Sequence, residues 1–119
     1  MIKYIILIFI SFSLHAEPTQ KNEVYKEAFK NGDTKYEVTY FNGKKNGEEI
    51  FWHENGLKKM QSNFLDGVEN GLWEQWYENG QLKIKVKFIG GKKNGEEFYW
   101  NKDGSIRFKD NYINGKVKK

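Results

Sequence analysis

Apolar and polar residues alternate in four segments of the chain that lie 24 residues apart. In the first segment, residues 36, 38 and 40 are Tyr, Val and Tyr, and the residues between them are polar. The pattern recurs at residues 60–64, 84–88 and 108–112. Alternation with a period of two predicts a β-strand with one buried face and one solvated face.

A second kind of segment follows each of the first three. Residues 48–53, 72–77 and 96–101 carry aromatic residues at adjacent positions, as at Phe51 and Trp52. Adjacent residues of a strand point to opposite faces of a sheet. These segments therefore predict strands of a thin sheet that covers both of its faces with large side chains.

Both kinds of segment belong to an internal repeat of 24 residues. The stretch at residues 43–49 recurs letter for letter at residues 91–97. Self-similarity at a fixed period in the twenties is typical of a repeat architecture. We place the starts of the units at Gly32, Gly56, Gly80 and Gly104, and a tryptophan recurs with the same step as Trp52, Trp76 and Trp100.

Two kinds of turn join the predicted strands. The pairs Asn-Gly or Asp-Gly that end at Gly56, Gly80 and Gly104 favour two-residue type I′ hairpin turns. The other links, residues 42–47, 66–71 and 90–95, are richer in glycine and predict wider bends. Because every link is short, neighbouring strands must be antiparallel.

The predicted fold is therefore all-β. It is an open antiparallel meander of β-hairpins in a single elongated sheet without a closed core. Its stability is expected to come from contacts between neighbouring units. The lysine-rich residues 116–119 are expected to guard the last edge against further strand pairing.

Residues 1–16 are predicted to be a signal peptide. A start that carries Lys3 precedes an apolar run from Tyr4 to Leu14, and Ala16 supplies a small residue at the cut. The run is shorter than the roughly 20 residues of a membrane-spanning helix, and an uncleaved membrane anchor is the alternative. Both interpretations place the rest of the chain outside the cytoplasm, so we expect a periplasmic or secreted protein.

The remaining chain divides at residue 31. Residues 17–31 are predicted to be a linker and a degenerate leading half-repeat, because Asn31-Gly32 falls on Asn55-Gly56 when it is shifted by 24 residues. Residues 24–29 are then expected to form a strand, with a short helical turn as the alternative. Residues 32–119 are predicted to be the repeat domain.

The recurring order of residues resembles the MORN repeat. This order is an aromatic, one or two residues, Gly, three residues and Gly, then an aromatic and Asn-Gly, and it covers Gly32 to Gly115. The likeness is to the bacterial variant form, in proteins often labelled YwqK-type antitoxins. The resemblance implies a hairpin array with no catalytic activity, and roles in protein contact or, for some eukaryotic members, proposed binding to membrane phospholipid. The antitoxin label implies a partner toxin, and an immunity role against a periplasmic toxin is consistent with export.

Composition narrows the classes of function. The chain has 119 residues, a formal net charge of +4 and no cysteine, so it forms neither a disulfide nor a cysteine-based metal site. The modest charge of an exported chain argues against nucleic acid as a partner. The glycines recur with the repeat and make no phosphate-binding motif, so we expect no cofactor.

A column of cations on the polar face of the first kind of strand is the predicted binding face. It would offer a stripe for phosphate head groups or for an acidic protein. The alternative is a solvated face that keeps an open sheet soluble, which Glu37 and nearby glutamate pairs favour. The residues are Lys35, Lys59, Lys83, Lys85, Lys87, Arg107 and Lys109.

Other candidate sites have simpler structural explanations. The tryptophan column would serve as a stacking platform for a glycan, but one ring per unit is also the expected ladder of a repeat sheet. The Glu-Glu pairs at residues 48–49 and 96–97 point to opposite faces, so neither makes the acid pair of a glycosidase. The loop around Asp103 lacks a calcium ligand at Tyr99, and His53 has no second histidine beside it. We expect no catalytic residue and no metal site.

The sequence thus predicts a non-enzymatic, exported repeat module that contacts another protein, such as a toxin. The alternative is a module at the envelope or membrane surface that binds anionic head groups through the lysine-rich face.

Overall fold

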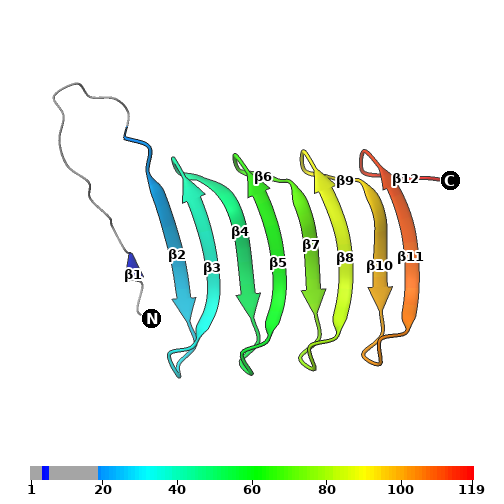
Figure 1. The fold of residues 1–119 in the computed structure, drawn as a ribbon, viewed down its shortest axis with the longest axis horizontal. Coiled ribbons are helices and arrows are strands. Elements are labelled where there is room, and N and C mark those ends of the chain that lie inside the picture. The colour runs from blue at the N-terminus through cyan, green and yellow to red at the C-terminus, as the bar shows by residue number, and fades with distance from the viewer. Residues whose placement is uncertain (1–3, 6–18) are drawn as a thin grey trace.

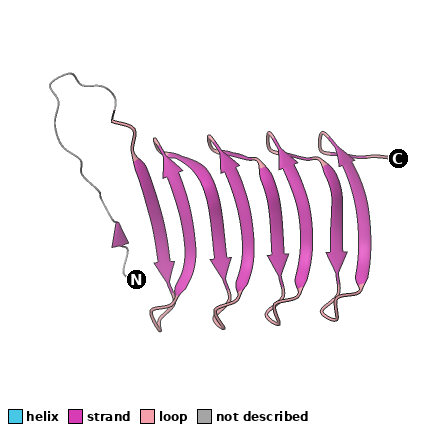
Figure 2. Cartoon of the chain, in the orientation of Figure 1, coloured by secondary structure: helices cyan, strands magenta, loops and turns pink. Residues whose placement is uncertain are grey.

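Consecutive strands lie side by side in one sheet without a crossover (Figure 1). The computed structural model describes residues 4–5 and 19–119, and all regular structure in them is β-strand (Figure 2). Neighbouring strands run antiparallel, so the predicted open meander in a single elongated sheet is confirmed. The strands are β1 (Tyr4–Ile5), β2 (Asn22–Ala28), β3 (Thr34–Phe41), β4 (Lys44–Trp52), β5 (Lys58–Leu65), β6 (Val68–Glu69), β7 (Gly71–Trp76), β8 (Leu82–Ile89), β9 (Lys92–Lys93), β10 (Gly95–Trp100), β11 (Ile106–Ile113) and β12 (Lys116–Val117).

The segment before the first full unit is a strand. Strand β2 pairs with β3 along its whole length, from Asn22 opposite Phe41 to Ala28 opposite Thr34. The helical turn that was the alternative for residues 24–29 is therefore wrong. The predicted signal peptide lies outside the described residues, apart from residues 4 and 5, which form β1 beside β2.

The two kinds of turn are exchanged relative to the prediction. The two-residue turns lie between β3 and β4 and at the equivalent links, where both central residues have positive φ, as a type I′ turn requires. In the first of them φ is 48° at Asn42 and 79° at Gly43. The wider bend predicted for these links is wrong. The equivalent pairs are Asp66-Gly67, Gly90-Gly91 and Asn114-Gly115.

The Asn-Gly pairs at the other end of the sheet close three-residue loops. Gly56 N donates to the carbonyl of His53 at 3.0 Å, and His53 N donates to the carbonyl of Leu57 at 2.8 Å. Only Gly56 has positive φ, as in a type I turn followed by a left-handed glycine. The side chain of Asn55 instead accepts a hydrogen bond from Leu57 N at 3.0 Å, which explains its place in the loop. The type I′ turn predicted at Gly56, Gly80 and Gly104 is wrong for this reason.

The sheet is one layer thick, 16 Å along the shortest axis of the molecule. Among the described residues, Val38 and Val86 are the only fully buried apolar side chains. Glu49, Ser62 and Glu97 are buried with them. The register puts Val38 opposite Glu49 and Glu49 opposite Ser62, so this buried row crosses the sheet on one face.

Aromatic rings beside the buried row shield it from solvent. The ring of Tyr36 lies 4.4 Å from that of Phe51 and 5.9 Å from that of Tyr25, measured between centroids. Tyr99 and Phe108 make the equivalent contact at 5.6 Å in the last unit. Neighbouring strands therefore cover one another laterally, because no second layer does so.

Candidate functional site

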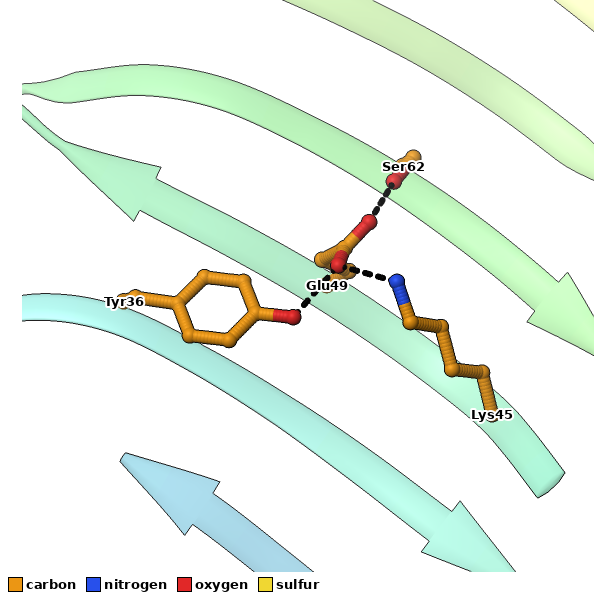
Figure 3. Close-up of polar contacts among 4 residues, drawn as sticks. All are labelled: Tyr36, Lys45, Glu49 and Ser62. Atoms are coloured by element: carbon orange, nitrogen blue, oxygen red, sulfur yellow. Dashed lines mark hydrogen bonds and ion pairs between the residues drawn. The ribbon is translucent and has the colours of Figure 1, made fainter. Parts of the chain in front are cut away.

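A buried glutamate gathers polar side chains from three adjacent strands. Figure 3 shows Tyr36 of β3, Ser62 of β5 and Lys45 of β4 around Glu49, which is also on β4. The Tyr36 hydroxyl donates to Glu49 Oε1 at 2.5 Å and Lys45 Nζ donates to the same oxygen at 2.6 Å. The Ser62 hydroxyl donates to Glu49 Oε2 at 3.2 Å. Both carboxylate oxygens are therefore satisfied within the sheet.

The identical seven-residue stretch builds a second cluster two units later. Lys93 Nζ donates to Glu97 Oε1 at 2.6 Å, and the Tyr99 hydroxyl donates to the same atom at 3.1 Å. Lys93 also lies 4.9 Å from the centre of the Tyr112 ring. In the unit between the two clusters, Trp73 stands at the glutamate position. The cluster therefore recurs only where the Lys-x-x-x-Glu spacing recurs.

Burial and hydrogen bonding act on the Glu49 carboxyl in opposite directions. Burial favours the neutral acid, but the hydrogen bonds from Lys45, Tyr36 and Ser62 and the lysine charge outweigh it and hold the pKa of Glu49 below its usual range. Burial, followed by the bond to Glu49, raises the pKa of Tyr36. A carboxylate that is ionised and fully paired is neither a free base nor a proton donor at neutral pH. The cluster is a structural element of the sheet.

The cations of the predicted binding face have different neighbours in the structure. Lys85 Nζ lies 3.5 Å from Glu74 Oε1, and Lys109 forms an ion pair with Glu96. Lys83 Nζ lies over the Tyr77 ring, 5.3 Å from its centre. Lys87 and Arg107 are exposed on β8 and β11. The acidic partners divide the column, so its members do not form one continuous positive stripe.

The structure brings Lys35 and Lys59 together at a hollow of about 540 Å³ near the first three-residue loops. Equivalent positions farther along the sheet are bridged, because His53 Nε2 hydrogen-bonds to the Trp76 carbonyl at 3.0 Å and the Tyr77 hydroxyl donates to the Trp100 carbonyl at 2.8 Å. Phe29, one unit earlier, has no polar atom to make this bond. The hollow is lined by Phe29, Lys35, Phe51, Trp52, His53, Glu54, Asn55, Lys59 and Glu78.

The three tryptophans have different surroundings. Trp52 lines the hollow. Lys58 Nζ lies 6.0 Å from the centre of the Trp76 ring, and Trp100 stacks on Phe98 with 5.4 Å between centroids. No two of them form an aromatic pair in the described part of the chain. They therefore do not make a continuous platform of stacked indoles.

Sequence reasoning missed a column of exposed apolar residues just before the type I′ turns. Leu65, Ile89 and Ile113 occupy the same position in successive units and are 59 %, 49 % and 52 % exposed. Val68 and Leu72 are exposed near them. The signal was present as a further apolar position with a 24-residue step. A patch of this kind marks a surface that another molecule covers.

Two classes of feature are absent from the residues that the structure describes. No group of three or more His, Cys, Asp or Glu side chains is placed to hold a metal ion. No helix in this part of the chain is long and apolar enough to cross a membrane.

Residues 69–89 and 93–114 match the model of the MORN repeat variant family. The chain carries MORN repeats of this variant type. Each matched segment contains one hairpin closed by a three-residue loop, β7 with β8 and β10 with β11. No curated protein and no solved structure matches the chain. A MORN array is a repeat module that mediates contact and carries no catalytic machinery of its own.

The buried Glu49 cluster predicts loss of stability in acid. Because the folded-state pKa of Glu49 is lowered, its contribution is present above the unfolded pKa of about 4.3 and is lost as the pH falls through the lower folded value. Glu49→Gln should lower the free energy of unfolding by about 1–3 kcal/mol at pH 7 and flatten its decline below about pH 4. Urea unfolding at a series of pH values measures both.

Glu48→Gln is the matched control, because Glu48 is exposed on the opposite face and bonds only to Gln61 at 2.8 Å. Its effect should be within about 0.5 kcal/mol. Equal losses for the two variants at pH 7 would contradict the structural role of Glu49.

Proposed function

We propose that this MORN-repeat protein is an exported, non-catalytic module that binds another protein through its sheet. The observation that carries the proposal is the exposure of large apolar side chains on a sheet that has no second layer. Soluble monomers rarely leave such patches uncovered, and a protein partner is the usual means of covering them.

The charge arrangement supports a protein surface over a lipid surface. Binding to anionic head groups depends on unpaired lysines close to the membrane. Lys85 and Lys109 are paired with Glu74 and Glu96, so two cations of the predicted stripe are already neutralised. Apolar residues beside paired charges are instead typical of a protein interface with a polar rim.

The resemblance to YwqK-type antitoxins supports a specific form of this function. The partner is then a toxin, and the protein neutralises it by covering its surface. The apolar run at residues 4–14 and the small residue at Ala16 support export to the periplasm or the medium. We place the encounter there, as for an immunity protein that meets its toxin outside the cytoplasm.

Capture of the partner from an envelope extract tests the proposal. A single stoichiometric protein should be retained in 0.5 M salt, roughly, because apolar contacts resist the screening that weakens ionic ones. The triple variant Leu65→Ser/Ile89→Ser/Ile113→Ser should lower the affinity at least about tenfold. Lys83→Ala/Lys85→Ala/Lys87→Ala should change it by less than about threefold.

The same two variants serve as a control against the membrane alternative. Vesicles that contain anionic lipid are mixed with each protein at low and high salt. Binding to vesicles that is salt-sensitive and is lost in the lysine variant, with no protein captured from the extract, would replace this proposal with a surface-anchored module.

Export makes a separate prediction. Expression of the full chain in a bacterial host should give a periplasmic product that starts at Glu17, because cleavage after Ala16 removes the apolar run. Fractionation followed by intact-mass measurement checks both points. A cytoplasmic product that retains Met1 would contradict export and leave protein binding to be judged by the capture experiment.

A further inference from the structure

Each unit pairs with the next through two residues of its first strand. Met60 lies opposite Gln75 and Gln61 opposite Glu74, between β5 and β7. One unit later, Ile84 lies opposite Tyr99 and Lys85 opposite Phe98, between β8 and β10. The same two positions therefore carry the contact between units each time.

The equivalent residues of the last long strand have no strand beside them. They are Phe108 and Lys109 of β11, and among the described residues only β12 pairs with the outer edge of β11, opposite Tyr112 and Ile113. Phe108 is 49 % exposed, whereas its equivalents Met60 and Ile84 are half-buried. The outer edge of β11 thus repeats an interface that the chain fills twice within itself.

Backbone groups of this edge point outward. Lys118 N donates to the carbonyl of Asn111 at 2.7 Å, so the polar groups of Asn111 face away from β10. Alternate residues of an antiparallel strand direct their N–H and C=O groups to the same side. The N–H and C=O of Lys109 therefore also face outward, and an unpaired edge of this kind is a template for an added strand.

The side chains of β11 select against the strands of this protein itself. In the filled positions, Val86 faces Glu97 across the junction between units, as the pairing of Lys85 with Phe98 requires. Asp110 stands at the position of Val86, and it already lies opposite the buried Glu97 on its inner side. A strand with the sequence of β10 would bring a second glutamate against Asp110, which is unfavourable.

A second copy of the chain is a poor occupant for a related reason. The leading strand β2 occupies the position of β10 three units earlier. Added to β11, it would place Lys26 opposite Lys109, and like charges directly opposite each other destabilise a sheet. Both ends of the array therefore disfavour head-to-tail association.

We propose that the outer edge of β11 binds an extended segment of a protein partner by strand addition. The segment carries Lys or Arg opposite Asp110 and, two residues later, an aromatic residue opposite Phe108. This inference rests on the proposed protein-binding function and gives it one specific contact. The cation neutralises Asp110, and the ring covers Phe108 in the way that Tyr99 covers Ile84.

A pair of peptides tests the side-chain selection. The first has the sequence of residues 94–101, which fits the filled position, and the second is the same peptide with Glu97→Lys. Fluorescence anisotropy with each labelled peptide, up to millimolar concentration, should show binding of the Glu97→Lys peptide at least about tenfold tighter, because a like-charge pair becomes an opposite pair.

A pair of protein variants tests the edge itself. Lys109→Pro removes the outward N–H and is tolerated at an edge whose amide faces solvent, whereas Lys109→Ala keeps it. Both variants lose the ion pair with Glu96, so they differ only in the backbone. Lys109→Pro should reduce peptide binding at least about tenfold relative to Lys109→Ala, with an unchanged circular dichroism spectrum for both.

Three results would overturn the inference: no binding of the Glu97→Lys peptide at millimolar concentration, equal binding of the two peptides, or equal binding by the Pro and Ala variants. Capture of a protein partner that is insensitive to Lys109→Pro, together with any of these results, would refute the edge site and leave the proposed function in place. Failure of capture with intact peptide binding would do the reverse.

Discussion

Hydrogen bonds between neighbouring units hold this sheet together at both ends of its strands. At the three-residue loops, Asn55 Nδ2 donates to the carbonyl of Glu78 at 2.6 Å, and Asn79 Nδ2 donates to that of Lys102 at 3.0 Å. At the type I′ turns, Gly91 N donates to the carbonyl of Glu69 at 2.8 Å. A single layer cannot enclose an apolar core, so each unit depends on its neighbours, with about 0.5–1.5 kcal/mol from each such bond.

This dependence explains where binding surfaces arise. Lateral contacts protect the row that runs through Val38, Glu49 and Ser62, but they cannot cover the outer residues of each face. Where a lateral bond is missing, as at Phe29, the surface opens into a hollow. Where a neighbouring strand is missing, as beside Phe108, an edge is left for another chain. The same lack of a second layer that limits stability supplies the surfaces for a partner.

The sequence predicted the architecture because its period was unbroken. Residues such as Tyr36 and Tyr40 alternate with polar ones, and the 24-residue step made each unit confirm the others. The turns could not be told apart in this way, because an Asn-Gly pair suits both. In the type I′ turn Asn42 has positive φ, whereas in the three-residue loop Asn55 bonds to Leu57 through its side chain.

The contents of the sites depended on register, which local pattern does not give. Glu49 was correctly placed on the face opposite to Glu48, but its cluster forms only when β3 and β5 bring Tyr36 and Ser62 beside it. The lysine column likewise shared one repeat position, while the partners of Lys85 and Lys109 come from the adjacent strands. Contacts between strands of different units therefore had to come from the structure.

Deletion of one complete period measures the dependence on neighbours most directly. Removing residues 56–79 joins Asn55 to Gly80 and preserves the loop, the strand lengths and the repeat step. The account predicts a β-sheet spectrum and cooperative unfolding at a lower urea midpoint, whereas removal of residues 56–67, half a period, should abolish cooperative unfolding. Loss of folded structure on removal of the whole unit, or equal tolerance of both deletions, would contradict it.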